Sequence, residues 1–121
     1  MKIKYTGIIL LPLMFLACSQ EKAEDIVLQE FGPSEIVAGE KFNVQPDGSS
    51  AMWIHAKNAT PSTVVVIGDH EMPAAVYEDN LNVSTGVPPD LISKPGTYSI
   101  YLLDKKTSKK SNELQFLVKG K

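Results

Sequence analysis

The chain has little of three residue types that many functional sites require. Its 121 residues include one cysteine, two histidines and no arginine. A single cysteine excludes an internal disulfide, and it also excludes the paired-cysteine spacings of structural zinc sites. The missing arginines would have supplied the guanidinium groups that nucleic-acid and phosphate sites favour. We therefore expect no nucleic-acid partner.

Signals for catalysis are equally sparse. A hydrolase needs a nucleophile, a neighbouring base and an acid that orients the base. Neither His55 nor His70 stands in a recognisable catalytic motif, and the serines are scattered through predicted loops. The sequence also has no glycine-rich phosphate loop. We expect a protein that is not an enzyme and that requires no cofactor.

Long hydrophobic runs are also missing. The uncharged segment Gly7–Ala17 follows Lys2 and Lys4 and contains Pro12. It is shorter than the roughly 20 apolar residues that a membrane-spanning helix needs. A positive start followed by a short apolar run is typical of a secretory signal peptide. We assign residues 1–17 to such a peptide.

Cys18 stands directly after this run, in the sequence "FLAC". These four residues resemble a bacterial lipobox, although Phe15 replaces the commonest leucine and Leu16 replaces a small residue. The resemblance implies that Cys18 carries diacylglycerol and that the new amino terminus is acylated, for example with palmitate. Two or three acyl chains would anchor the protein stably, because each buried methylene contributes about 0.8 kcal/mol. The alternative is a free thiol at the end of an ordinary signal peptide.

The predicted processing defines the location and charge of the mature chain. Cleavage before Cys18 leaves 12 − 2 = 10 lysines against 14 acidic residues, a net charge of −4. Residues 18–25 are polar and charged, as expected for a flexible, lipidated tether. By resemblance to the enterobacterial sorting rule, Ser19 after the cysteine indicates the outer membrane. The expected location is therefore the bacterial cell envelope, with the membrane as one partner.

The rest of the chain shows a β pattern. No window keeps apolar residues at helical spacing, and eight prolines and eight glycines separate short β-rich runs. These runs are residues 25–31, 40–46, 51–57, 62–68, 74–78, 81–85, 96–104 and 112–118. Short strands at such regular intervals are typical of an antiparallel β-sandwich. We predict an all-β fold, a sandwich of about seven to eight strands in one domain over residues 26–119.

Alternation within two runs predicts which side chains are buried. In residues 51–57, Met52, Ile54 and Ala56 share one face, which leaves Trp53 and His55 on the other. Residues 96–104 are apolar on both faces, which favours a central position in a sheet. We expect the Met52 face to point into the core.

Several segments in order resemble an IPT/TIG domain. They are "FGPSEIVAGEKFNV", "WIHAKNA", "VVVIG", "VPPDLISKPGTYSIYLLD" and "KSNELQFLV". One departure is Ala56, which stands where the family usually has glycine. The resemblance implies an immunoglobulin-like fold of the E-set type. It also implies a binding or spacer module that has no shared ligand site.

Three aromatic side chains are candidates for partner binding: Trp53, His55 and Tyr101. An exposed tryptophan can anchor a partner, which here would be another envelope protein or a glycan. The alternative is that a loop or the tether covers Trp53, or that the predicted face is reversed.

A metal site is the competing hypothesis. In "GDHEMP", His70 and Met72 offer nitrogen and sulfur ligands, and His55 could add a third. Copper in the bacterial periplasm is the metal that this ligand set suggests. The alternative is a polar hairpin tip whose Met72 covers the edge of the core.

Overall fold

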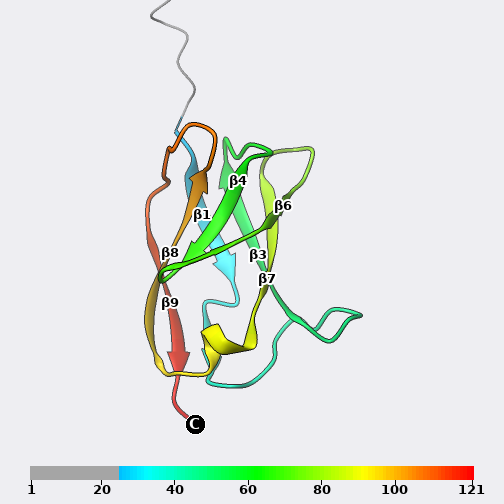
Figure 1. The fold of residues 1–121 in the computed structure, drawn as a ribbon, viewed down its shortest axis with the longest axis vertical. Helices are drawn as coiled ribbons and strands as arrows, with labels where there is room; N and C mark the ends of the chain where they lie inside the picture. The colour runs from blue at the N-terminus through cyan, green and yellow to red at the C-terminus, as the bar shows by residue number, and fades with distance from the viewer. Residues whose placement is uncertain (1–24) are drawn as a thin grey trace, which may run out of the picture.

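A computed structural model describes residues 25–121 as two β-sheets packed face to face (Figure 1). The strands are β1 (Val27–Gly32), β2 (Glu35–Val37), β3 (Ser50–Lys57), β4 (Thr63–Ile67), β5 (His70–Met72), β6 (Ala74–Val76), β7 (Asn82–Val87), β8 (Gly96–Asp104) and β9 (Leu114–Lys119). A 3₁₀ turn, η2 (Pro89–Ile92), follows β7. The predicted signal peptide and Cys18 lie outside the described residues.

The strand order is that of an immunoglobulin-like sandwich. One sheet has the order β1-β3-β7-β6, and the other has the order β2-β9-β8-β4-β5. These orders correspond to the A-B-E-D and G-F-C sheets of the immunoglobulin fold, with β2 and β5 added at the two edges of the second sheet. All strand pairs are antiparallel except β2 with β9. The predicted all-β sandwich is therefore confirmed.

Most of the predicted strands are present, and one is wrong. Seven of the eight predicted runs overlap a strand, but residues 40–46 belong to a loop. Asn43 has a φ of 41°, which takes the backbone out of the extended region. The chain then reverses, because the Gln45 N–H donates to Ser49 O and the Gly48 N–H donates to Gln45 O, both at 2.8 Å. The sequence pattern missed β2 and β5, which have three residues each and are too short to show alternation.

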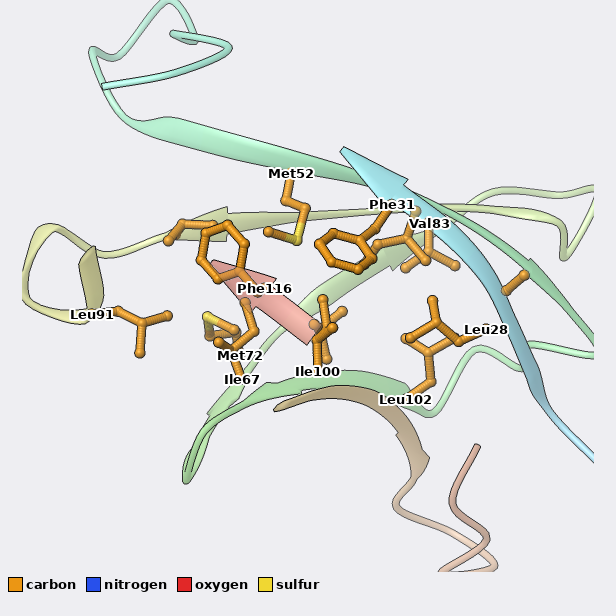
Figure 2. Packing of buried hydrophobic residues seen from close by; sticks show 14 of the residues in the cluster. Leu28, Phe31, Met52, Ile67, Met72, Val83, Leu91, Ile100, Leu102 and Phe116 are labelled. Atoms are coloured by element: carbon orange, nitrogen blue, oxygen red, sulfur yellow. The ribbon is translucent and has the colours of Figure 1, made fainter. Parts of the chain in front are cut away.

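The core lies between the two sheets, as Figure 2 shows. Met52, Ile54 and Ala56 are fully buried, which confirms the predicted inward face of β3. β8 lies between β9 and β4 in its sheet, which confirms its predicted central position. Phe31 and Phe116 meet edge to face across the core, with ring centroids 6.2 Å apart. Each such large apolar side chain contributes about 1.5–3 kcal/mol through burial.

Asn112 joins the edge of β1 to the segment before β9. Its Oδ1 accepts a hydrogen bond from the Leu28 N–H at 2.8 Å, and its Nδ2 donates to Leu28 O at 3.0 Å. The pairing register of β1 with β3 shifts between Leu28 and Glu30. The amide side chain therefore supplies backbone partners next to an irregularity in the ladder.

Asp104 is a buried carboxylate that fastens the loop after β8 to the loop before β4. It accepts hydrogen bonds from the hydroxyl of Ser62 at 2.7 Å and the hydroxyl of Thr60 at 2.9 Å. The backbone N–H of Lys106 also donates to it, at 2.9 Å. The hydrogen bond from Ser62 is the largest cause that lowers the pKa of Asp104 to about 2, while burial opposes the shift. Asp104 as a whole residue is 5% exposed, so these bonds replace its lost contact with water.

The lowered pKa of Asp104 predicts a loss of stability in acid. The folded state holds this carboxyl ionised at a pH where the unfolded chain, with a pKa near 3.8, already binds a proton. Its contribution of about 2 kcal/mol is therefore complete above pH 4 and disappears as the pH falls towards 2. We expect Asp104→Asn to lower the free energy of unfolding by about that amount at pH 7 and by little near pH 2. Urea denaturation at both pH values measures this difference, and an equal loss at both would contradict the assignment.

Candidate binding surface

The outer face of the four-stranded sheet carries Trp53 in a row of small side chains. Across the sheet, Trp53 pairs with Gly32 of β1 on one side and with Ser84 of β7 on the other. Ser84 in turn pairs with Ala75 of β6. Because none of these neighbours is large, the indole ring stands above the sheet. Trp53 is 43% exposed, which confirms the predicted outward direction of its side chain.

Gly32 and His55 hold the indole ring in place. A Cβ atom at Gly32 would lie 2.6 Å from Nε1 of Trp53, so the ring covers the backbone where a side chain would otherwise stand. The His55 ring packs against the indole with centroids 4.9 Å apart and an interplanar angle of 43°. Nδ1 of His55 is 2.9 Å from Oε2 of Glu30, which orients the imidazole. The tryptophan is therefore a positioned side chain on an exposed face.

A groove of about 400 Å³ adjoins Trp53. Its lining residues come from β3, β7, the segment after β6 and the loop between β2 and β3: Asn43, Val44, Gln45, Ala51, Met52, Trp53, Tyr77 and Ser84. Tyr77 is 55% exposed and Val44 is 57% exposed, so apolar surface is open to solvent on both sides of the groove. Such a combination of aromatic surface with a few polar groups is typical of ligand sites.

The loop that forms one wall of the groove is fastened to β3. The Asn43 side chain donates through Nδ2 to Ala51 O at 3.1 Å, and the Phe42 N–H donates to Oγ of Ser50 at 3.1 Å. Gln45 donates through Nε2 to Asn43 O at 2.7 Å. The side-chain bonds of Asn43 and Gln45 use the nitrogen atoms of their amide groups. The wall is thus ordered by its own side chains.

The third predicted binding residue lies on the other side of the molecule. Tyr101 belongs to β8, where it alternates with the buried Ile100 and Leu102, so it is on the outer face of the five-stranded sheet. Nζ of Lys110 stands 4.3 Å from the centroid of its ring. The structure brings Trp53 and His55 together but does not bring Tyr101 to them. The three candidate residues therefore lie on two faces of the molecule, Trp53 and His55 on one sheet and Tyr101 on the other.

Tyr77 and the loop residues Asn43–Gln45 were not found from the sequence. Tyr77 follows β6, and its N–H donates to Asn82 O at 3.0 Å, which carries it to the outer face of the sheet beside β7. The only signal in the sequence was an aromatic residue just before the Asp79-Asn80 turn. Tyr77 lies beside this loop because of the pairing between strands, which a local sequence pattern does not predict.

The residues of the metal hypothesis lie apart. His55 is on the outer face of the four-stranded sheet, whereas His70 is exposed on β5, at the edge of the other sheet. Met72 is buried in the core at 4% exposure, as Figure 2 shows. Between residues 25 and 121 there is no group of three or more His, Cys, Asp or Glu side chains that could hold a metal ion. His55, His70 and Met72 therefore do not lie close enough together to form one copper site.

Gly32→Ala should displace the indole of Trp53, because the added methyl group would occupy the space of the ring. Trp53 is the only tryptophan, so its fluorescence reports this position alone. We expect the emission of the variant to move to longer wavelength as the ring becomes more exposed to water. Gly86→Ala is the matched control, since its Cβ would meet only Ser50 O at 3.9 Å. An unchanged spectrum in Gly32→Ala would show that the ring does not rest on Gly32.

Comparison with known proteins leaves the family open. Neither the known family models nor the curated protein sequences contain a match to this chain. Within residues 25–121, no helix is long and apolar enough to cross a membrane. The resemblance to IPT/TIG domains stays a prediction from the sequence.

Proposed function

We propose that this protein is a lipid-anchored lipoprotein of the bacterial envelope whose immunoglobulin-like domain binds a partner without catalysis. The observation that carries the proposal is the exposed Trp53, held between Gly32 and His55 beside a groove. Exposed apolar side chains gathered beside a groove favour an interaction site, and tryptophan is enriched at the centre of such sites. The acyl chains at Cys18 would hold the domain at the membrane, by resemblance to the lipobox.

The position of the groove suits a tethered domain. Residue 25 enters at one end of the sandwich, where Nδ2 of Asn58 donates to Asp25 O at 2.9 Å (Figure 1). The loop between β2 and β3 projects near the opposite end (Figure 1). A tether at the first end would therefore keep the loop that forms one wall of the groove away from the anchor.

The sheet edges support binding by the face rather than by strand addition. Of the four edge strands, β2, β5 and β6 have three residues each, and Pro73 stands between β5 and β6. The fourth, β1, is partly covered because Asn112 bonds to the backbone of Leu28. Glu71 of β5 is paired with Lys105, with Oε2 and Nζ 2.9 Å apart. Short edges that carry proline and paired charges resist the addition of a further strand.

The groove also supports a role without catalysis. Its lining contains one hydroxyl from serine, Ser84, and no histidine or carboxylate to act as a base. His55 lies outside the lining, paired with Glu30. A nucleophile with no base in reach is not activated.

Trp53→Ala should weaken binding of the partner. In cells that make the full-length protein, we expect chemical crosslinking or co-purification to recover a partner with the wild type and at least about tenfold less with Trp53→Ala, as for the loss of a central aromatic anchor. Tyr101→Ala is the matched control, because Tyr101 is an aromatic residue on the opposite sheet. Equal recovery with wild type and Trp53→Ala would rule out this surface.

The anchor has a separate test. Mass spectrometry of the purified protein should find the amino-terminal peptide beginning at Cys18 and carrying two or three acyl chains. Cys18→Ser should move the protein from the membrane fraction to the soluble fraction, because the acyl chains supply the membrane affinity. An unmodified Cys18 thiol in the mature protein would contradict the anchor and leave the binding surface unaffected.

A further inference from the structure

We infer that the groove beside Trp53 binds a neutral glycan. This inference rests on the proposed function and adds the chemical class of the ligand. Four features support it: the charge of the lining, the two aromatic side chains, the pattern of hydrogen-bonding groups and the limited size of the surface.

The lining of the groove carries no charged residue. Charged residues make up 21% of the sequence, yet none of the residues that line the groove is Asp, Glu, Lys or Arg. An anionic polymer would require lysines, and a cation would require carboxylates. The lysine-rich loop after β8 carries its own acidic partners, for example Glu113, whose Oε2 is 2.6 Å from Nζ of Lys110. An uncharged lining indicates an uncharged ligand.

Trp53 and Tyr77 provide aromatic surface for the apolar faces of sugar rings. A pyranose presents C–H groups on its faces and hydroxyl groups around its edge, so it packs on an aromatic ring while its edge forms hydrogen bonds. Both side chains are about half exposed, Trp53 at 43% and Tyr77 at 55%. Because aromatic side chains have only two side-chain torsions, they lose little conformational entropy on binding. Trp53 loses still less, since Gly32 and His55 already fix its ring.

The polar groups of the lining match hydroxyls in particular. The side-chain nitrogen of Asn43 donates to Ala51 O of β3, and that of Gln45 donates to Asn43 O within the loop, which leaves Oδ1 and Oε1 as acceptors. Nε1 of Trp53 and the hydroxyl of Tyr77 have no hydrogen-bond partner within residues 25–121 and are available as donors. A sugar hydroxyl both donates and accepts, so it satisfies either kind of group. A purely apolar ligand would leave these groups unpaired.

The size of the surface favours a glycan over a protein. A volume of about 400 Å³ is in the range of ligand pockets, about 300–1,000 Å³. A stable protein interface buries about 800 Å² on each partner. The other exposed apolar side chains do not extend the groove to such an area. Val27 pairs with Lys57, and Leu81 O accepts from the Ala56 N–H, so both lie at the tether end of β3.

Titration of the full-length protein in detergent with defined oligosaccharides tests the inference. The probes are maltoheptaose, cellohexaose, xylohexaose and chitohexaose, which are neutral, and an oligogalacturonate, which is anionic. We expect at least one neutral probe to change the fluorescence of Trp53 with a dissociation constant below about 1 mM, and the anionic probe to have no effect. Tyr77→Ala keeps the reporter and should weaken binding at least about tenfold. Tyr101→Ala is the matched control and should bind as the wild type does.

Three results would overturn the inference. The first is the absence of any fluorescence change with all four neutral probes. The second is a concentration-dependent dimer in light scattering that Trp53→Ala abolishes, because a second copy would then occupy the groove. The third is an envelope protein recovered with the wild type and lost with Trp53→Ala, together with no response to the neutral probes. This last result would leave the proposed binding function intact. If neither a protein nor a glycan bound in a way that depends on Trp53, both proposals would be wrong.

Discussion

The packing of apolar side chains between two sheets is the interaction on which this molecule depends. With one cysteine in the chain, no internal disulfide can join the sheets, so burial and hydrogen bonding must do so. Phe31 from one sheet meets Phe116 from the other, and fully buried residues of β3 and β8 fill the space around them. Asn112 and Asp104 add polar fastenings at the periphery, each with its hydrogen-bonding groups satisfied by named partners. The domain is therefore held without covalent help.

The same strand that anchors the core also presents the candidate site. β3 is buried through Met52, Ile54 and Ala56, and the two-residue period of a strand then directs Trp53 and His55 outward. A register slip of one residue would bury the tryptophan and expose the core residues, so core packing fixes the direction of the indole. The exposure of Trp53 is thus a consequence of the register of β3, which core packing determines. Its precise resting place, on Gly32, comes from the pairing of β3 with β1.

The positions of most strands, and which of their side chains point into the core, could be predicted from the sequence because both depend on local patterns. Alternation in residues 51–57 and the apolar character of residues 96–104 identified an inward face and a central strand, and both are present. Residues 40–46 show where local reasoning failed. Their composition suits a strand, but a left-handed Asn43 and the turn at Gly48 fold them back over β3 as the wall of the groove. The loop conformation depends on specific hydrogen bonds to Ser50 and Ala51, eight residues further along the chain, which composition and alternation do not reveal.

The sequence by itself determined the all-β class, the inward face of β3 and the outward direction of Trp53, since periodicity and composition act over a few neighbouring residues. Only the tertiary structure decided what surrounds the tryptophan. It separated Tyr101 from Trp53 by placing them on different sheets, and it brought Tyr77 and the Asn43–Gln45 loop to the groove instead. The physical reason is that a sandwich is assembled from pairings between distant strands, and the free energy that selects those pairings comes from the whole core.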